Sequence, residues 1–330
     1  MLLSIIIPHY NLPRELLERC IASITQLEIA ADDYEIIVVD DGSATAPVWA
    51  ESAYPGINIR VIAAAHGGPG AARNRGIEEA KGTYIEFIDA DDTIIPGDSY
   101  RQCIDELQTE RPQILHFNYR IVPPGKAPLA KCDKQVRFSN TISGAKYMLD
   151  FNLPGSPCCY FLSRELLFEK NIRFPENILH EDEEFNTILH FHARTLVHSN
   201  AVLYNYCTRE GSTTANSSKE FEEKRINDML CIIERVARFR NTQQNCNAQQ
   251  SKGFYHKFTM LGVDAIRNML SVGMSAKEII EKCSEHLTPL GLYPLPQAQY
   301  SIKYRIFSSL ANSNCGMKIL RLLTPSKKFH

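Results

Sequence analysis

The first 90 residues alternate between short apolar runs and segments with helical spacing, and this alternation constrains the fold more than any other feature. The apolar runs are Leu3–Ile7, Glu35–Val39, Ile57–Ala63 and Tyr84–Ile88. β-Branched and aromatic residues dominate these runs, which is typical of strands buried within a parallel sheet. Strands that alternate with helices predict an α/β fold, with a doubly wound, mostly parallel sheet flanked by helices.

Acidic side chains follow two of these runs. Asp40 and Asp41 come after the second run, and Asp89, Asp91 and Asp92 come after the fourth. Ligands of open α/β sheets bind at the carboxyl ends of the strands, so both clusters are expected at one edge of the sheet. Crowded carboxylates repel one another, and Mg²⁺ or Mn²⁺ shared with a substrate diphosphate would offset that repulsion. The alternative is an acidic turn that caps the next helix.

A glycine-rich loop at residues 66–70 precedes a predicted helix over residues 71–80, which carries Arg73. The loop does not have the Gly-x-Gly-x-x-Gly spacing of dinucleotide-binding proteins. The guanidinium of Arg73 is a fixed positive fork that suits a phosphate or the neighbouring carboxylates. The alternative is an arginine exposed on the surface of the helix.

A second acidic cluster, Glu181-Asp182-Glu183-Glu184, opens a predicted amphipathic helix. Acids in the first turn of a helix are stabilised by the helix dipole, which is the structural interpretation. The functional interpretation makes one of them a general base that faces a cleft. Two short strands are expected after this helix, at residues 195–198 and 202–207.

Two domains are expected, one over residues 1–215 with all of these motifs and a helical one over residues 216–330. The sequence contains no acid after Glu285, whereas six basic residues follow among apolar ones, namely Lys303, Arg305, Lys318, Arg321, Lys327 and Lys328. A basic amphipathic tail of this kind can lie on anionic lipid. The alternative is a set of helices packed on their own domain with a solvated basic face.

Composition argues against several functional classes. The net charge is −2, from 36 basic and 38 acidic residues, so no global positive field favours nucleic acid as a partner. The ten cysteines form no Cys-x-x-Cys pair, which argues against a zinc ribbon and a thioredoxin motif. The sequence begins without the features of a signal peptide and contains no run of about 18 apolar residues. We therefore expect a cytoplasmic protein, with peripheral contact at the inner face of the cell membrane if the tail binds lipid.

Four motifs follow one another in the first 92 residues: Ser4–Asn11, Val38–Ser43, Gly70–Gly76 and Phe87–Asp92. Their sequences are Ser-Ile-Ile-Ile-Pro-His-Tyr-Asn, Val-Val-Asp-Asp-Gly-Ser, Gly-Ala-Ala-Arg-Asn-Arg-Gly and Phe-Ile-Asp-Ala-Asp-Asp. In this order, with an acidic pair downstream, they resemble the family 2 inverting glycosyltransferases of the GT-A fold. The resemblance covers roughly residues 1–215.

This resemblance implies a donor site, a metal and a base. The metal, Mn²⁺ or Mg²⁺, would be held by Asp91 and Asp89, and Asp182 would be the general base, preferred over its neighbour Glu181. Residues implied in binding the donor nucleotide and its diphosphate are Pro8, Tyr10, Asn11, Asp40, Asp41, Arg73, Asp89, Ala90, Arg209 and Ser212.

Two departures from the family pattern bear on function. His66 stands where the family frequently has asparagine. The Gln-x-x-Arg-Trp motif of processive synthases is absent, since the only tryptophan is Trp49. The second departure favours the addition of a single sugar over processive synthesis.

The expected function is metal-dependent, inverting transfer of one sugar from a nucleotide-sugar donor, UDP-linked, to a hydroxyl of a glycan or lipid-linked acceptor. Synthesis of cell-surface polysaccharide is the expected process. One alternative is a sugar-phosphate nucleotidyltransferase, which would release pyrophosphate. Another is a non-catalytic protein that binds sugar nucleotides.

Overall fold

The computed structural model describes residues 1–153, 155–209, 218–297 and 301–325. They form two compact units. The first contains residues 1–144, 156–178 and 192–209, and the second contains the described parts of 145–155, 179–191 and 218–325. The two units therefore interleave along the sequence, and the expected domain boundary at residue 215 stays a prediction.

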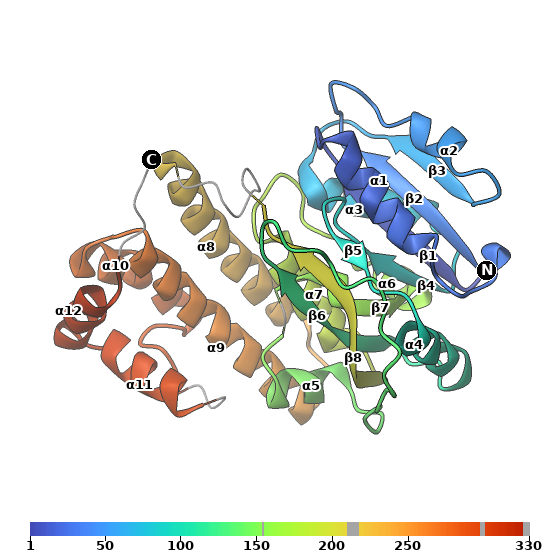
Figure 1. Cartoon of the computed structure of the whole chain (residues 1–330). Helices are drawn as coiled ribbons and strands as arrows, with labels where there is room; N and C mark the ends of the chain where they lie inside the picture. The colour runs from blue at the N-terminus through green and yellow to red at the C-terminus, as the bar shows by residue number, and fades with distance from the viewer. Residues whose placement is uncertain (154, 210–217, 298–300, 326–330) are drawn as a thin grey trace. The chain divides into compact units, whose positions relative to one another are not determined.

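An eight-stranded sheet with the order β3-β2-β1-β4-β7-β6-β8-β5 forms the centre of the first unit (Figure 1). The first four strands in this order are mutually parallel. Beyond them the pairing is mixed, because β7 is antiparallel to both of its neighbours and β5 is antiparallel to β8. The mixed α/β architecture confirms the predicted fold class. The strands are β1 (Leu3–His9), β2 (Tyr34–Asp40), β3 (Ile59–Ala63), β4 (Tyr84–Phe87), β5 (Thr93–Ile94), β6 (Ile114–Val122), β7 (Tyr160–Ser163) and β8 (Leu196–Cys207).

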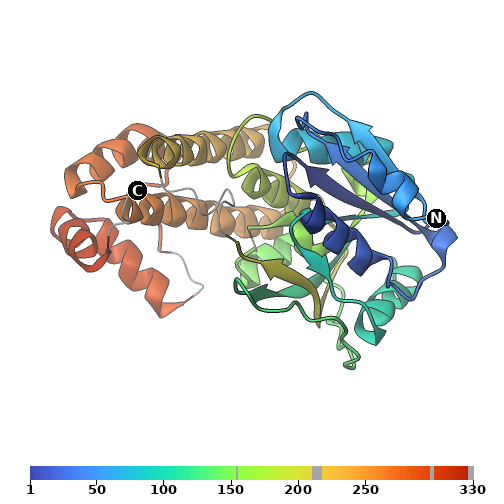
Figure 2. The same ribbon diagram turned by 45° about the horizontal axis from the view of Figure 1, so that its top comes forward.

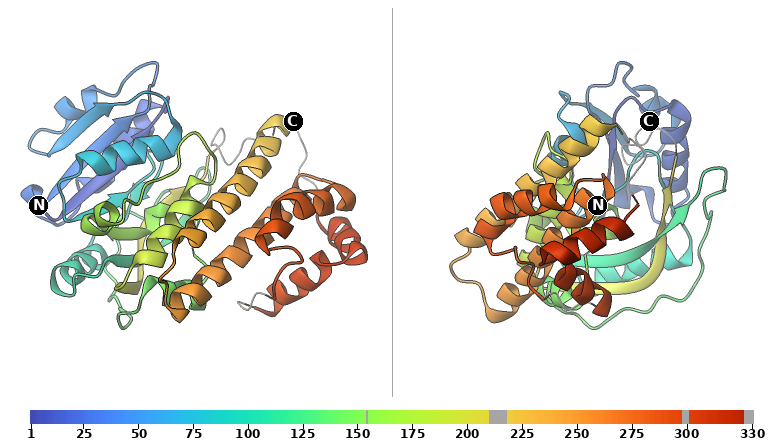
Figure 3. Two further views of the ribbon diagram at one scale, coloured as in Figure 1. Left: turned by 180° about the vertical axis from the view of Figure 1, so that it is seen from behind. Right: turned by 90° about the vertical axis from the view of Figure 1, so that its left-hand side faces the viewer.

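Helices α1 and α3 cover opposite faces of the parallel strands, as Figures 1 and 3 show from opposite sides. Helix α1 buries Leu17, Ile21 and Ile24, which recur at helical spacing. Helix α3 approaches β1 closely because Gly76 has no side chain, and a Cβ there would lie 2.3 Å from Cγ2 of Ile6. The helical segments of this unit are α1 (Arg14–Ile24), η1 (Ala31–Asp33), α2 (Trp49–Ala53), α3 (Gly68–Glu79), α4 (Asp98–Thr109), η2 (Pro157–Cys159) and α6 (Arg164–Glu169).

The second unit consists of helices, of which α8 and α9 pack side by side (Figure 2). Helix α10 (Ala276–Lys282) begins with a capping box, in which Ser275 and Glu278 exchange reciprocal hydrogen bonds. Within the described residues, no helix is both long enough and apolar enough to span a membrane. The helical segments are α5 (Gly144–Asp150), α7 (Glu181–His192), α8 (Lys219–Thr242), α9 (Ala248–Ser271), α10 (Ala276–Lys282), η4 (Cys283–Leu287), η5 (Thr288–Leu290), α11 (Ile302–Ala311) and α12 (Asn314–Leu323).

Candidate functional site

The carboxyl ends of β1 and β2 bring His9 and Asp40 together. These residues face each other in the strand register, and His9 Nδ1 lies 3.2 Å from Asp40 Oδ1. Both side chains are buried, and Ser43 Oγ lies 3.3 Å from the same histidine nitrogen. Sequence reasoning gave His9 no role, although its position directly after Pro8 at the end of a buried strand is the signal that could have identified it.

Asp41 holds the amino terminus of α3. Its two carboxylate oxygens accept hydrogen bonds from the backbone N–H groups of Gly67 and Gly68, over 2.8 and 2.9 Å. The ring of His66 is also close, with Nδ1 2.9 Å from Oδ2. A carboxylate at a helix amino terminus complements the unpaired N–H groups and the helix dipole. The geometry thus gives Asp41 a positioning task and joins the end of β2 to α3.

Tyr10 and His66 form an exposed aromatic pair beside these acids. Their ring centroids are 4.2 Å apart with an interplanar angle of 21°, and Tyr10 is 45% exposed. Asn11, in the left-handed region with φ of 47°, fixes the loop through its side chain, which accepts a hydrogen bond from the backbone N–H of Ala44. Exposed flat rings at a sheet edge offer a stacking surface for a nucleobase.

Arg73 lies on α3 and is only 5% exposed, so its interpretation as a surface arginine is wrong. Its Nη2 donates to Asp89 Oδ1 over 2.8 Å, and its guanidinium lies 5.4 Å from the centre of the Phe174 ring. Burial of an arginine requires such partners, because an unpaired buried charge is strongly destabilising.

Asp91 pairs with Arg209, whose Nε donates to Asp91 Oδ2 over 2.7 Å. Arg19, a residue that sequence reasoning did not single out, donates from Nη2 to the backbone carbonyl of Asp91. Ala90 is buried between the two acids and therefore offers only its backbone. The two predicted metal ligands, Asp89 and Asp91, are thus each paired with an arginine while their carboxylates still reach solvent.

Asp92 anchors the acidic turn to β8. Its carboxylate accepts hydrogen bonds from the Tyr204 hydroxyl and from the Cys207 backbone N–H, each over 2.6 Å. The same hydroxyl accepts a hydrogen bond from the backbone N–H of Asp89 over 3.2 Å. Burial, together with the charge of Asp89, raises the pKa of Asp92 to about 8. Asp92 therefore supports the turn, and its oxygens are already occupied.

The acids in the first turn of α7 have different partners. Glu183 accepts a hydrogen bond from Lys257 Nζ over 2.6 Å, and this lysine is 2% exposed. Glu184 is paired with Arg235 of α8, with Nη2 2.9 Å from Oε1. These ion pairs assign Glu183 and Glu184 to the packing of the helical unit. Glu181 and Asp182, the two acids expected to include the general base, lie in the same helical turn, and Glu181 is the more buried of the two.

The model of the family "Glycosyl transferase family 2" matches residues 4–170. The chain belongs to glycosyl transferase family 2. The matched range contains the four motifs from β1 to the acidic turn.

Curated relatives of this family 2 protein agree with the assignment. The uncharacterized glycosyltransferase EpsJ of Bacillus subtilis is 30% identical over 196 residues, covering 53% of this chain and 54% of EpsJ. The uncharacterized glycosyltransferase YibD of Escherichia coli is 29% identical over 217 residues, covering 62% of this chain and 60% of YibD. The chain thus spans less than two thirds of the length of these two relatives.

Solved structures show the same fold. The family 2 chain superposes on Staphylococcus aureus TarS 1–349 in complex with UDP with a TM-score of 0.65 and 18% identity, covering 98% of this chain and 90% of that one. The mannosyltransferase PcManGT from Pyrobaculum calidifontis, in complex with GDP-Man and Mn²⁺, gives a TM-score of 0.53 at 14% identity, covering 97% and 86% of the two chains.

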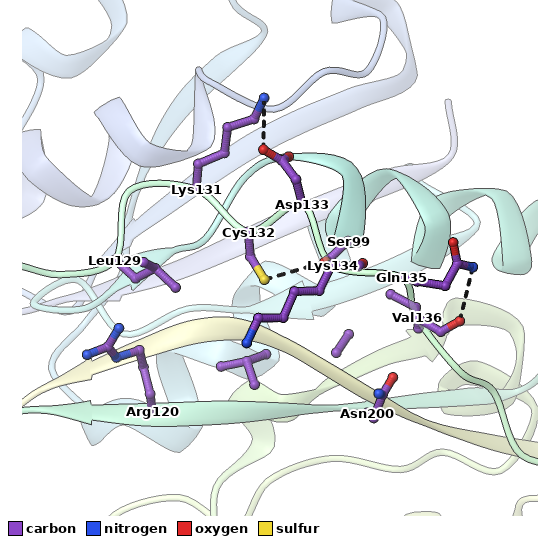
Figure 4. A pocket seen from close by; sticks show the side chains of 12 residues that line it. Ser99, Arg120, Leu129, Lys131, Cys132, Asp133, Lys134, Gln135, Val136 and Asn200 are labelled. Carbon is purple, nitrogen blue, oxygen red and sulfur yellow. Dashed lines mark hydrogen bonds and ion pairs between the residues drawn. The ribbon is translucent and has the colours of Figure 1, made fainter.

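A cavity of about 630 Å³ lies in the first unit of the family 2 protein, beneath residues 129–136 (Figure 4). Arg120 and Lys134 extend along it, whereas Lys131 turns away to pair with Asp133 over 3.4 Å. Leu129, Val136 and Val202 contribute apolar side chains to its lining. This cavity lies apart from the predicted donor residues.

One predicted donor residue, Ser212, lies outside the described residues. The other residues predicted for the site, both donor-binding and catalytic, fall into two groups. Those of the first unit gather at the sheet edge around Asp40 and Asp89, and Glu181 and Asp182 belong to the helical unit.

Proposed function

We propose that this family 2 protein transfers one sugar from a UDP-linked donor to a hydroxyl of a glycan or lipid-linked acceptor, with inversion at the anomeric carbon. The observation that carries the proposal is the set of side chains at the carboxyl ends of the parallel strands. There, a stacking surface at Tyr10 lies near buried Asp40, and two acid–arginine pairs lie at the next strand end. Base, ribose and diphosphate have chemically matched partners in that order.

A divalent cation, Mn²⁺ or Mg²⁺, fits the donor set at the acidic turn. Asp89 and Asp91 have partly exposed carboxylate oxygens, and such cations are held by one or two carboxylates together with substrate phosphates. Within the described residues no group of three His, Cys, Asp or Glu side chains could hold a metal alone, so the diphosphate would supply the remaining ligands. When bound, the cation neutralises charge that develops on the leaving diphosphate.

Arg73 and Arg209 then have a second task. Each guanidinium is paired with an aspartate of the acidic turn and has further N–H donors. Phosphate oxygens compete with these carboxylates for the same forks, so the arginines would contact the diphosphate while the aspartates turn to the cation. Ser212, three residues after Arg209 in the sequence, is proposed as an additional diphosphate contact.

Asp182 is proposed as the general base, with Glu181 beside it. Its carboxylate would take the proton of the acceptor hydroxyl, whose oxygen then forms a bond to the anomeric carbon from the face opposite the nucleotide. The bond between that carbon and the diphosphate oxygen breaks, and UDP leaves with the electron pair. The assignment rests on the resemblance of Glu181-Asp182, in the first turn of α7, to the acidic pair of the family 2 glycosyltransferases.

Relatives support the choice of donor and acceptor. The TarS structures bind UDP-GlcNAc or UDP, and PcManGT binds GDP-Man with Mn²⁺. TarS is named a poly(ribitol-phosphate) beta-N-acetylglucosaminyltransferase, and ExoO of Rhizobium meliloti is named a succinoglycan biosynthesis protein. We accordingly place the reaction in polysaccharide synthesis, on the cytoplasmic side of the membrane where nucleotide sugars are used. The cavity under residues 129–136 is proposed as part of the acceptor side.

A donor screen tests this function. The full chain is incubated with Mn²⁺ and a panel of UDP-, GDP- and other nucleotide sugars, and release of the nucleoside diphosphate is measured. We expect release from one UDP-linked sugar and its loss with EDTA. Pyrophosphate formed from a sugar phosphate and a nucleoside triphosphate would instead identify a nucleotidyltransferase. Donor binding without turnover, with any acceptor offered, would identify a non-catalytic binder.

A further inference from the structure

Helices α11 and α12 expose large aliphatic side chains. The exposed fractions are 66% for Ile302 and 56% for Ile306 on α11. On α12 they are 41% for Ile319, 86% for Leu322 and 72% for Leu323. Scattered single apolar residues on a surface need no explanation. Five within 22 consecutive positions are different, because exposing that much aliphatic surface to water is unfavourable in free energy. We call these five residues the aliphatic surface.

The spacing places the residues of the aliphatic surface in ridges along the two helices, and Leu323 also lines a pocket with Arg225 and Arg267. Ile302 and Ile306 are four residues apart, and Leu322 and Leu323 follow Ile319 by three and four. The inward face of α12 is also apolar, since Met317 and Leu320 are buried. A helix that is apolar on both faces is normally covered on both faces. An apolar phase is therefore needed on the outward side of α12.

Basic residues border the ridges. Lys303 and Arg305 are exposed beside Ile302 and Ile306, and Lys318 is exposed beside Ile319. None of these three side chains takes part in an ion pair within the described residues. The sequence has no acid after Glu285, so no neighbouring carboxylate along this part of the chain offsets their charge. The surface therefore combines aliphatic side chains with basic side chains that form no ion pair within the described residues.

We propose that the aliphatic surface of α11 and α12 docks on a membrane that contains anionic phospholipid. Aliphatic side chains would enter the boundary between headgroups and acyl chains, and the basic residues would contact lipid phosphates. A second copy of this chain fits less well, because pairing two such surfaces would bring like charges together. Each helix has ten residues, about 15 Å of α-helix, so the contact is peripheral and does not span the bilayer.

Co-sedimentation of the full chain with vesicles tests the proposal. One set of vesicles contains equal parts of phosphatidylglycerol and phosphatidylcholine, and the other contains phosphatidylcholine alone. We expect binding to the anionic set only, with affinity that falls as salt is raised. Each basic residue near the surface contributes about fivefold to the partition coefficient, so Lys318→Ala should reduce binding by roughly that factor.

Two double variants test the aliphatic ridges separately: Ile302→Glu with Ile306→Glu, and Ile319→Glu with Leu322→Glu. Each should reduce binding at least about tenfold, because charge is placed where apolar side chains would enter lipid. Val48→Glu is the matched control, since Val48 is an aliphatic residue of the first unit with the same 66% exposure as Ile302, and its binding should be unchanged. Circular dichroism spectra and melting curves of all variants check that they fold.

Several results would overturn the proposal. Equal sedimentation with the two vesicle sets, or unchanged binding by both folded double variants, would exclude this docking surface. A wild-type dimer that the α12 variant converts to a monomer, without any vesicle binding, would assign the surface to a second copy. No sugar or nucleotide is present in these measurements, so they stand or fall independently of the proposed transfer reaction.

Discussion

Arg209 donates a hydrogen bond from Nε to Oδ2 of Asp91 over 2.7 Å, so a predicted phosphate contact and a predicted metal ligand are each other's partners. Arg73 and Asp89 repeat the arrangement, with Nη2 of Arg73 2.8 Å from Oδ1 of Asp89. Two acids and two arginines therefore neutralise one another at the sheet edge. In the proposed complex, the phosphate oxygens would pair with the arginines and the divalent cation with the aspartates.

The first prediction concerns Arg209→Ala. Loss of a charge-assisted hydrogen bond to a phosphate typically costs about 1.5–3 kcal/mol, so kcat/KM for the donor should fall about 10- to 100-fold. Steady-state kinetics at saturating acceptor measure this. Arg209→Lys is the control, because it retains the positive charge but loses the planar guanidinium. Its kcat/KM should lie between those of the wild type and Arg209→Ala. Unchanged donor kinetics in Arg209→Ala would remove Arg209 from the donor site.

Asp91→Asn tests the metal site. The neutral amide keeps the shape of the side chain but removes the negative charge that a hard divalent cation requires. We expect transfer to fall at least about 100-fold, since metal stabilisation of a leaving phosphate contributes several kcal/mol. Titration with Mn²⁺ in the presence of the donor should show weaker metal activation. An Asp91→Asn enzyme that retains full activity and full Mn²⁺ dependence would contradict the assignment.

Asp182→Asn tests the general base. Proton transfer by a positioned base contributes about 10²- to 10⁴-fold, and kcat should fall within that range while donor affinity, measured by calorimetry, stays the same. Glu181→Gln is the matched variant, with a neighbouring acid changed to its amide. A larger loss in Glu181→Gln than in Asp182→Asn would transfer the role of base to Glu181.

Lys257→Met tests the ion pair beneath the acidic cluster. The substitution leaves Glu183 without its buried partner, which is expected to lower the free energy of unfolding by about 3–5 kcal/mol. Urea denaturation measures the change. The double variant Lys257→Met with Glu183→Gln removes both charges and should recover much of the loss. A single variant within about 1 kcal/mol of the wild type would show that the pair is not needed for stability.

Glu86→Gln tests the protonation state of a buried acid in strand β4 of the sheet. Glu86 is fully buried and accepts a hydrogen bond from the Tyr100 hydroxyl over 2.6 Å, and burial raises its pKa to about 8 from an ordinary value of 4.5. The folded state therefore favours the protonated form. The stability that this group provides is complete below pH 4.5 and is lost as the pH rises toward 8, at up to about 1.4 kcal/mol per pH unit.

Urea denaturation across this pH range measures the slope. Glu86→Gln should flatten it, although buried Asp92, with its pKa also raised to about 8, keeps part of it. Glu110→Gln is the control. Because Glu110 is an exposed acid, its replacement should leave the slope unchanged. Identical slopes in Glu86→Gln and wild type would show that Glu86 is not protonated in the folded state at neutral pH.

Local sequence patterns were sufficient to predict the parallel half of the sheet. Each of β1, β2 and β4 is a compact run of apolar residues followed by a polar turn. The apolar run identifies the strand, and the turn marks where it ends. Strand β8 was harder to predict. Two short strands were expected, whereas residues 196–207 form one strand. Its pairing with β6 passes from His198 directly to Val202, so the polar residues Ser199 and Asn200 lie at an irregularity inside this strand.

At the site, residue types could be predicted but partners could not. Asp40 and Asp41 have the same side chain at adjacent positions, yet one faces His9 and the other holds the N–H groups of α3. Only the three-dimensional course of the glycine-rich loop distinguishes them. The four acids of α7 are likewise equivalent in sequence, and the ion pairs to Lys257 and Arg235 depend on helices that begin more than 35 residues later.

The anchorage of Asp92 to Tyr204 has a consequence for folding during synthesis. The two residues are 112 positions apart, so closing this contact requires almost the whole first unit to have left the ribosome. Long-range contacts of this kind form late and slowly. A nascent chain that ends before β8 can pair β3, β2, β1 and β4, but its acidic turn has no anchor. The acidic turn is therefore anchored only after β8 has been synthesised, and we expect a product truncated before β8 to lack the arrangement proposed for donor binding.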